Sequence, residues 1–572
     1  MNTVKLVEVA RGDTPADLVL KNCKIINVFT SEIENADIAI TDGIIVGIGK
    51  YEGIKEIDIK NRFVAPGFID GHVHIESSML TPPQFAKIIV PSGTTTIIAD
   101  PHEIANVSGV EGIKYMIFSS IFGPLNVKIM IPSCVPATSF ETSGAVISSV
   151  DIDHFKTNKG VLGLGEVMNY PGVIFGEEEM HKKIDAMKLY VKDGHAPSVT
   201  GKQLNAYKLT GIKTDHECTT VEELHEKVSR GMYIHLREGS ATRNVKVLSK
   251  GVTKENSRRL IFCTDDKHSE DIRIEGHINY NIRLAIENGV DPITAIQMAT
   301  INTADCYKLD HIGAIAPGYD ADIVIFDSLK LIDVDEVFIK GEMVAKGKKA
   351  LFDPVLYTNG YVTDTVNILD SDNISLDIAL KSNKVKVIKL IENNVTTTKV
   401  IRNVFIKDGI FEFDNSVDIL KLAVVERHHQ TGNVGLGFLE GYGLKNGAVA
   451  MTVAHDSHNL IIIGDNDKDM KIAMKEIEKI RGGITLVNNG QVVESIQLEV
   501  GGIMTNTDVK VIESKLKRMD AAARKMGVNN NVDDPFLSLA FMSLPVIPDL
   551  KLTDKGLFDV NLFKLVSLEE EC

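Results

Sequence analysis

The sequence predicts an α/β protein in which a (β/α)₈ barrel is combined with a small β-domain and a C-terminal α+β domain. Its 572 residues exceed what one ordinary domain needs, although a barrel alone takes about 250. Apolar strand-like runs alternate with helical stretches between residues 66 and 311. Short strands punctuated by turns precede this segment and return after it. We therefore expect one β-domain built from both flanks of an inserted barrel.

The small β-domain is predicted at residues 1–65 and 312–355. Residues 17–65 contain the runs "DLVLKNCKII", "ADIAITDGIIVGIGK" and "RFVAPGF", with Asp42-Gly43 as a tight hairpin signal. A similar texture returns in "IGAIAPGYDADIVIFDSLKLIDVDEVFIKGEMVAKG".

The barrel is predicted at residues 66–311 because its strand-like runs all end in polar residues. The runs are "FIDGHVH", "TTIIADPHE", "VKIMIPSC", "VLGLGEV", "LYVKDGHA", "GIKTDHE", "MYIHLRE" and "LIFCTDD". Active sites of such barrels lie at the carboxyl ends of the strands, where these polar residues fall. Asp291 can cap the last helix, with Pro292 in its first turn.

Residues 356–572 are predicted to form the C-terminal α+β domain. "MKIAMKEIEKIRGG" places Ala473, Ile477 and Ile480 on one helical face with glycine at the end. "GITLVNNGQVVESIQL" follows, and Asn489-Gly490 indicates a hairpin.

Composition narrows the class of partner and the kind of metal site. The formal net charge of −16 disfavours nucleic acid and anionic membranes, since both are negatively charged. We find no signal peptide and no run of eighteen apolar residues, and we expect a soluble cytoplasmic protein. Six scattered cysteines support neither a disulfide framework nor a cysteine-rich zinc site. Any metal must be held by nitrogen and oxygen.

The pair His72 and His74 is the first candidate for metal binding. In a strand, residues i and i+2 point to the same side, so both imidazoles can converge on one ion. Alone, an H-x-H pair is about as often a satisfied structural pair as a ligand pair. Its position at the end of the first barrel strand favours the ligand interpretation.

Other strand ends supply partners for this pair. They are Glu166 after the fourth strand, His195 after the fifth, His216 after the sixth, and Asp265 or Asp266 after the eighth. Four histidines and two carboxylates suffice for two ions, with Glu166 able to bridge them. The sequence therefore predicts a binuclear site.

Two divalent ions about 3.5 to 4 Å apart would hold a hydroxide, because a metal lowers the pKa of bound water to roughly 7. An aspartate after strand eight would take the proton of that water and return it to the leaving group. Asp265 and Asp266 are both candidates for this proton transfer and for the metal, and we favour Asp265.

Three further clusters have functional and ordinary structural interpretations. Asp100, His102 and Glu103 could contact substrate or orient ligands, or could form an ordinary loop and helix cap. Arg237 and Glu238 could meet a heterocycle, or could be a surface ion pair. The stretches "ERHHQTGNVGLGF" and "VAHDSHNLIIIG" could close the barrel mouth or hold another ion, or could simply be turns.

These residues resemble the amidohydrolase superfamily and, within it, the bacterial and archaeal adenine deaminases. "PGFIDGHVH" and "APGYDADIVIF" resemble the superfamily. "GHVHIESSML", "ADPHEIANV", "GLGEVMNYPGV", "DGHAP", "TDHE", "HLREGS", "CTDD", "GNVGLGF" and "VAHDSHN" resemble blocks of the adenine deaminases. The resemblance covers nearly the entire chain.

The resemblance implies a metal-dependent amidohydrolase barrel that deaminates adenine to hypoxanthine and ammonia. It implies two divalent ions per chain, Mn²⁺ or Fe²⁺ with Zn²⁺ as another option. The ligands it implies are His72, His74, Glu166, His195, His216 and Asp265. Because the strand-four residue is Glu166, no carboxylated lysine is needed.

In the implied reaction, the bridging hydroxide attacks C6 of the purine and an acidic side chain relieves charge on a ring nitrogen. Glu238 and Glu103 are the candidates for this acid. His102, Glu103 and Arg237 are candidate contacts to adenine. We also expect a homo-oligomer, specifically a dimer.

Two alternatives stay open at this stage. The chain could be another amidohydrolase that acts on a cyclic amide or a different nucleobase, or a barrel without catalytic activity. A cytidine-type zinc deaminase is excluded because no P-C-x-x-C pair accompanies His74 and Glu76.

Overall fold

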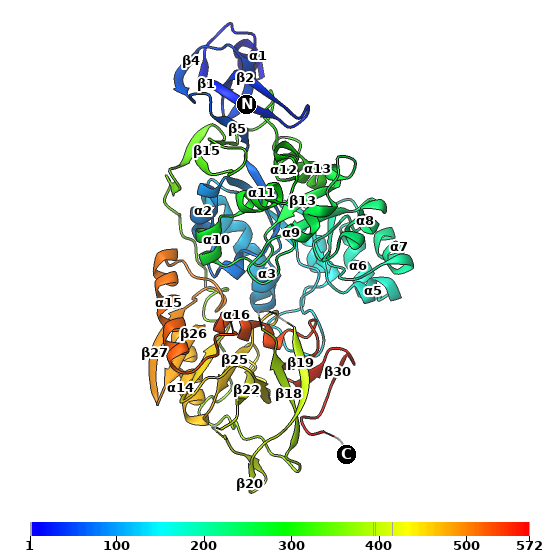
Figure 1. Cartoon of the computed structure of the whole chain (residues 1–572), viewed down its shortest axis with the longest axis vertical. Helices are drawn as coiled ribbons and strands as arrows, with labels where there is room; N and C mark the ends of the chain where they lie inside the picture. The colour runs from blue at the N-terminus through cyan, green and yellow to red at the C-terminus, as the bar shows by residue number, and fades with distance from the viewer. Residues whose placement is uncertain (1–2, 393, 395, 415, 533, 571–572) are drawn as a thin grey trace.

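The computed structural model describes residues 3–392, 394, 396–414, 416–532 and 534–570. The chain is elongated, and three regions follow one another along its long axis (Figure 1). The N-terminal sheet lies at one end, the parallel strands and their helices lie in the middle, and the C-terminal sheet lies at the other end.

The N-terminal sheet joins both flanks of the central region. Its order is β17-β16-β15-β14-β5-β1-β2-β3, with β4 also paired to β1. The strands are β1 (Ala16–Asn27), β2 (Glu32–Thr41), β3 (Ile44–Gly49), β4 (Gly53–Asp58), β5 (Phe63–Pro66), β14 (Ile323–Phe326), β15 (Val334–Ile339), β16 (Glu342–Lys346) and β17 (Lys349–Ala350). Asp42 and Gly43 both have positive φ between β2 and β3, which confirms the predicted turn.

The central region contains parallel strands in two sheets, ordered β10-β9-β8-β7-β6 and β11-β12-β13. The strands are β6 (Phe68–Val73), β7 (Thr94–Ala99), β8 (Asn126–Ile131), β9 (Val161–Val167), β10 (Val191–Gly194), β11 (Thr214–Asp215), β12 (Tyr233–Arg237) and β13 (Leu260–Cys263). Gly194 N–H donates to Thr214 Oγ1 at 3.1 Å, and Asp265 N–H donates to His72 O at 2.9 Å. These bonds join the two sheets at both of their edges.

Helices connect the parallel strands and cover them on the outside (Figure 1). They are α2 (Pro82–Ile89), α3 (His102–Ser119), α4 (Ser149–Phe155), α5 (Tyr170–Phe175), α6 (Glu178–Ala186), α7 (Gly201–Leu209), α8 (Val221–Ser229), α9 (Val245–Leu248), α10 (Ser269–Glu275), α11 (Ile278–Glu287), α12 (Pro292–Met298) and α13 (Ile301–Tyr307). As predicted, the Asp291 carboxylate caps α12, accepting from the N–H groups of Ile293 and Thr294, and Pro292 is in its first turn.

The C-terminal region is a mixed sheet with order β19-β18-β23-β22-β25-β24-β26-β27. The strands are β18 (Lys384–Leu390), β19 (Thr397–Asn403), β22 (Ile419–Val425), β23 (Val434–Glu440), β24 (Gly447–Met451), β25 (Leu460–Gly464), β26 (Gly483–Asn488) and β27 (Gln491–Gln497). The helices are α14 (Asp467–Ile480), α15 (Val509–Lys525) and α16 (Pro535–Ala540). The predicted helix and the hairpin at Asn489-Gly490 are both present, as α14 and the turn between β26 and β27.

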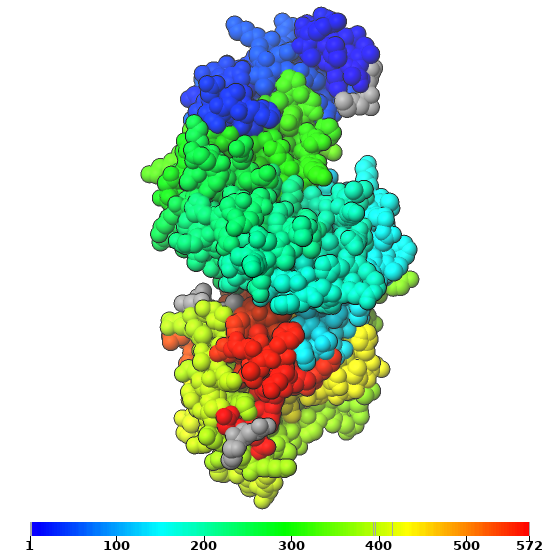
Figure 2. Space-filling view, turned by 90° about the vertical axis from the view of Figure 1, so that its right-hand side faces the viewer, coloured from blue at the N-terminus to red at the C-terminus, as the bar shows by residue number. Residues whose placement is uncertain are grey.

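The loop between β8 and α4 joins the central region to the C-terminal region. Thr142 Oγ1 donates to Asp554 Oδ2 at 2.7 Å, and the rings of Phe140 and Phe558 lie 4.8 Å apart. Figure 2 shows this cyan segment against the red C-terminal residues. The two regions therefore share a packed boundary. Among the described residues, no helix is both long and apolar enough to cross a membrane.

Candidate metal centre

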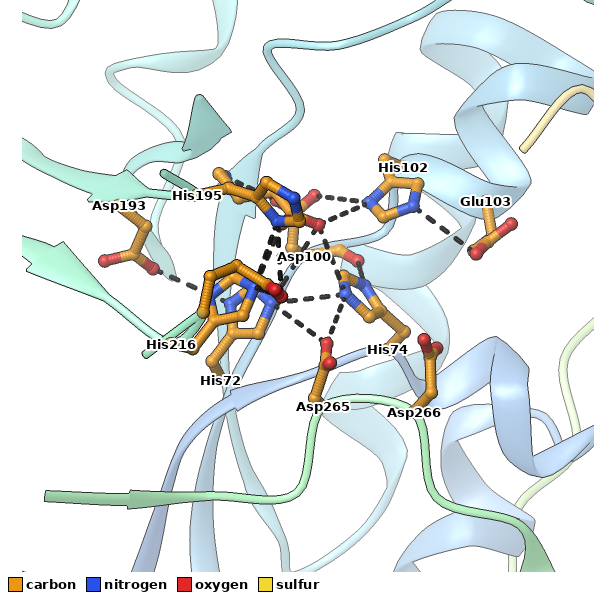
Figure 3. Close-up of polar contacts among 12 residues, drawn as sticks. His72, His74, Asp100, His102, Glu103, Asp193, His195, His216, Asp265 and Asp266 are labelled. Atoms are coloured by element: carbon orange, nitrogen blue, oxygen red, sulfur yellow. Dashed lines mark hydrogen bonds and ion pairs between the residues drawn. The ribbon is translucent and has the colours of Figure 1, made fainter. Parts of the chain in front are cut away.

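His72, in β6, and His74, directly after it, meet at the carboxyl end of the strand. Every residue of β6 is buried, so the strand is fixed on both faces. The Nε2 atoms of His72 and His74 lie 3.2 Å apart (Figure 3). His74 Nδ1 is 2.9 Å from Asp100 O, and because a carbonyl only accepts, this nitrogen carries the proton. The Nε2 atom of His74 therefore presents a lone pair to His72.

Glu166, near the end of β9, lies at the centre of the cluster. Its Oε1 atom is 3.3 Å from His74 Nε2, and its Oε2 atom is 2.7 Å from His195 Nδ1 and 3.2 Å from His216 Nε2. Each oxygen thus faces a different group of histidines. This is the arrangement that a bridging carboxylate requires.

His195 and His216 follow β10 and β11 and form the second group. His195 Nδ1 and His216 Nε2 lie 3.2 Å apart, and the ring of His216 stacks on that of His72 at 4.3 Å. His216 is almost fully buried. Because β10 and β11 end at the same edge as β6 and β9, His72 and His216, 144 positions apart in sequence, become neighbours.

Asp265 closes the cluster after β13. Its Oδ1 atom is 3.1 Å from His74 Nε2 and 3.6 Å from His72 Nε2, while its Oδ2 atom accepts from Arg237 at 2.7 Å. Asp265 has a φ of 57°, a left-handed conformation that aspartate tolerates better than most residues. Asp266 also has a carboxylate oxygen within 4.8 Å of ligand atoms of His74 and Asp265, and it accepts a hydrogen bond from the Ser77 hydroxyl.

The electrostatic field keeps the carboxylates of the cluster ionised. Burial acts to raise the pKa of Glu166, but the charges and hydrogen bonds of His195, His102 and His216 outweigh it and lower the pKa well below its usual value. Burial acts in the same way on Asp265, but the charge of Arg237 together with the contacts of His72 and His74 outweighs it, so the pKa of Asp265 is also lowered. The cluster therefore offers anionic oxygens in a buried site.

The contacts of this cluster fit metal ions better than protons. With its proton on Nδ1, His74 presents an unprotonated Nε2 to Asp265 Oδ1 at 3.1 Å and to Glu166 Oε1 at 3.3 Å, so acceptors face acceptors there. Histidine nitrogen and carboxylate oxygen are suitable ligands for divalent zinc, manganese and iron. Groups of three from this set have ligand atoms within 4.8 Å of one another, including His72, His74 and Glu166 and also Glu166, His195 and His216.

Several residues that the sequence analysis passed over support the cluster. Glu217 lies 3.5 Å from His216 Nε2 and 3.7 Å from His195 Nδ1, and it pairs with Arg237. Asp193 accepts from Tyr307 Oη and Thr214 Oγ1, and its Oδ2 is 3.9 Å from His72 Nδ1. Asp193 in "DGH" and Glu217 in "DHE" are close in sequence to predicted ligands, and this closeness could have identified them.

The candidates Arg237 and Glu238 have different surroundings, although they are neighbours in the sequence. Arg237 is buried and bonded to Asp265 and Glu217. Glu238 accepts from Val245 N–H at 3.2 Å, and among the described residues no hydrogen bond or ion pair joins it to the histidine cluster. Burial raises the pKa of Glu238 to about 7.

His102 and Glu103 start helix α3 beside the cluster. His102 Nδ1 is 3.3 Å from Glu166 Oε1, and its Nε2 is 3.4 Å from Glu103 Oε1. Figure 3 shows His102 between Glu103 and the other histidines. Both side chains are almost fully buried.

Comparison with known proteins places the chain among the amidohydrolases. Residues 63–344 match the amidohydrolase family, and residues 394–564 match the adenine deaminase C-terminal domain. An adenine deaminase of Clostridium acetobutylicum is 49% identical over 98% of this chain and 99% of its own. A second, named adenine deaminase 2, from Carboxydothermus hydrogenoformans is 48% identical over 98% of each chain. A solved structure of enamidase matches with a TM-score of 0.44 and 20% identity over 60% of this chain and 98% of its own.

Proposed function

Since the chain belongs to the adenine deaminases of the amidohydrolase family, we propose that it hydrolyses adenine to hypoxanthine and ammonia at the cluster around Glu166. The observation that carries this proposal is the unprotonated Nε2 of His74, which is paired with carboxylate oxygens of Glu166 and Asp265 at 3.3 and 3.1 Å. A structural histidine network would place a hydrogen on one partner of each pair and an acceptor on the other.

The proposed architecture is a closed (β/α)₈ barrel at residues 66–311. The two hydrogen bonds that join the parallel sheets at their edges support closure. The N-terminal sheet supports a discontinuous β-domain at 1–65 and 312–355, followed by a third domain at 356–572. Cytoplasmic location and a dimeric state stay predictions.

The proposed ligands of two divalent ions are His72, His74, Glu166, His195, His216 and Asp265. Glu166 would bridge, because each of its oxygens faces a different histidine group. Mn²⁺ or Fe²⁺ is proposed and Zn²⁺ is the alternative, since all accept nitrogen and oxygen ligands. When bound, such ions activate water at neutral pH and polarise the substrate.

The protein supplies the proton transfers that this hydrolysis requires. We assign the transfer to the leaving ammonia to Asp265 because its Oδ1 faces the histidines, whereas Asp266 is bonded to Ser77. The Arg237 guanidinium fixes Asp265 through Oδ2 and leaves Oδ1 toward the site. In this proposal Arg237 orients a carboxylate, and contact with adenine is left to His102.

Glu238 is the better of the two candidates for donating a proton to the purine ring. Its raised pKa of about 7 leaves a substantial protonated fraction at neutral pH. Glu103 instead faces three imidazoles, whose charges outweigh burial and lower its pKa well below the usual value. A carboxylate held in this way accepts hydrogen bonds and does not donate them.

The test is ammonia release from adenine by protein loaded with Mn²⁺, beside a His72→Ala variant. We expect the variant to lose metal and activity, and an exposed-histidine control, His225→Ala, to keep both. Equal rates for the parent protein and His72→Ala would refute the site. Guanine and dihydropyrimidines are tested in parallel, because turnover of these without adenine would favour the alternative amidohydrolase activity.

A further inference from the structure

A loop of the C-terminal region reaches the edge of the candidate metal centre. The loop, residues 454–459, follows β24 and precedes β25. His455 Nδ1 lies 2.6 Å from Glu103 Oε1, and His458 Nε2 contacts Glu103 Oε2. All three side chains are at least 94% buried. Residues more than 350 positions apart therefore form one polar cluster.

Glu103, His455 and His458 also have ligand atoms within 4.8 Å of one another, but hydrogen bonds account for the contacts of this second cluster. Ala454 N–H donates to His458 Nδ1 at 3.1 Å, so this nitrogen is an acceptor and the ring proton lies on Nε2. That proton points at Glu103 Oε2. The Nδ1 atom of His455 likewise faces a carboxylate oxygen, which only accepts. Each histidine thus donates to its own oxygen.

Glu103 in turn faces the metal centre through His102. The Oε1 atom of Glu103 lies 3.4 Å from His102 Nε2, and His102 Nδ1 lies 3.3 Å from Glu166 Oε1. The ring of His102 meets the ring of His74 at 4.4 Å (Figure 3). A carboxylate that contacts one nitrogen of a histidine fixes its tautomer and ring orientation. The position of Glu103 therefore affects the wall of the site.

The stretch "ERHHQTGN" (residues 426–433), also in the C-terminal region, holds loop 454–459 in place. The buried guanidinium of Arg427 donates to His458 O and to Gly501 O, the latter at 2.9 Å. His428 Nε2 lies 2.7 Å from Ser457 O. The ring of Phe541 stacks on His455 at 4.7 Å. The stretches "ERHHQTGN" and "VAHDSHN" thus form a single structural unit.

We propose that loop 454–459 completes the active site, with His455 and His458 as positioning residues that fix Glu103 and, through Glu103, the ring of His102. This inference rests on the proposed deamination, since it assigns the C-terminal region a part in that reaction. It also distinguishes this cluster from a third metal site.

Amide substitutions at His455 test the inference because they differ only in where the N–H group lies. Asparagine places its amide nitrogen near the position of imidazole Nδ1, and glutamine places it near Nε2. His455→Asn keeps the donor to Glu103 and is expected to retain kcat within about fivefold. His455→Gln and His455→Ala remove it and are expected to lower kcat about 10- to 100-fold, the range for residues that orient a metal site from outside it.

Two further measurements separate positioning from folding and from metal binding. The Mn²⁺ content is expected to stay at two ions per chain in every His455 variant. The change is expected in kcat, with KM for adenine altered less than threefold. His458→Ala is expected to behave like His455→Ala, since it frees the other oxygen of Glu103.

Several outcomes would overturn the inference. Unchanged kcat in His455→Gln and His455→Ala would do so, and so would equal losses in His455→Asn and His455→Gln. A third Mn²⁺ ion that is lost in His455→Ala would identify a metal site instead. If the parent protein releases no ammonia from adenine, the proposed function fails. A deshielded imidazole proton, present in the ¹H NMR spectrum of the parent and absent in Glu103→Gln and His455→Ala, would then still show whether His455 holds Glu103.

Discussion

The cluster around Glu166 and the cluster around Glu103 contain the same residue types at similar burial, yet their atoms face one another differently. Around Glu166, the unprotonated Nε2 of His74 faces carboxylate oxygens of Glu166 and Asp265 at 3.3 and 3.1 Å, so acceptors face acceptors. Around Glu103, the ring nitrogens of His455 and His458 that face the carboxylate oxygens are available as hydrogen-bond donors. An ion needs converging lone pairs, whereas a hydrogen bond needs one donor and one acceptor. Residue composition alone therefore does not distinguish a metal site from a hydrogen-bonded network.

The backbone explains the difference between the clusters. His72 and His74 lie two residues apart at the end of a strand, so their side chains point to one side. His455 and His458 lie three residues apart on a tight turn, in which His458 N–H donates to Ala454 O and His458 has a φ of 52°. On that turn the backbone N–H of Ala454 donates a hydrogen bond to Nδ1 of His458, so this nitrogen is not free to bind a metal ion.

The largest effect is expected from the carboxylate at the centre of the first cluster. Glu166→Gln removes the charge that would neutralise two ions, and we expect kcat to fall about 1,000-fold, a loss of about 4 kcal/mol of transition-state stabilisation. Metal content should fall below two ions per chain. Activity assays and metal analysis measure both, with exposed Glu222→Gln as the control. Full activity at two ions per chain would refute the bridging role.

Removing the support of the second cluster should mainly affect stability. Arg427→Met leaves the carbonyls of His458, Thr365 and Gly501 without this donor. Because each buried unsatisfied carbonyl costs about 1 to 3 kcal/mol, we expect a loss of at least about 3 kcal/mol, measured by urea unfolding.

The bound metal should be retained in folded Arg427→Met, since the first cluster is untouched. Arg481→Met provides the matched control, because Arg481 is exposed and its ion pair is with Asp364. Equal stability of the two variants would show that Arg427 does not anchor the loop.

The two clusters should respond to pH in opposite directions. The Glu103 charge raises the pKa of His455 to about 9 against the effect of burial, and Asp266 and Asp456 act in the same direction. The folded protein therefore binds a proton that the unfolded chain loses near pH 6.5. The stabilisation is complete below about pH 6.5 and is lost as the pH rises through about 9.

A melting series from pH 6 to 10 measures this response. The difference in Tm between the parent and His455→Asn should be largest near pH 6 and close by about pH 10. Metal content should instead fall as the pH decreases, because histidine must lose its proton to bind an ion. A Tm difference that widens toward pH 10 would contradict the assignment.

The smallest effect is expected at His429, an exposed residue of the stretch "ERHHQTGN". His429 Nε2 lies 2.9 Å from Ser143 O at the edge of the loop between β8 and α4. His429→Ala should change kcat less than about twofold, since surface substitutions outside special features have small effects. Steady-state assays measure kcat of this variant and, for comparison, of His428→Ala, which loses the contact to Ser457 O. A larger loss of kcat in His429→Ala would show that His429 also helps to position Glu103.

The sequence by itself determined the members of the first cluster. A period of two in β6 and polar residues after each parallel strand were sufficient to bring His72, His74, Glu166 and His216 together in the structure. The reason is geometric, because the carboxyl ends of neighbouring parallel strands lie at one edge. Polar residues that follow several strands of one sheet can therefore be predicted to lie close together, even when they are far apart in the sequence.

Only the tertiary structure decided which partners Glu103 and Arg237 take. Sequence patterns placed Glu103 at a helix start, but its contacts come from a loop about 350 residues away. Arg237 could have been a surface ion pair, and the fold buries it between Asp265 and Glu217. No periodicity encodes how the C-terminal region packs on the parallel strands, since that packing depends on the shape and polarity of whole surfaces. The same packing places hydrogen-bond partners on each ring and so decides which histidines are free to bind metal.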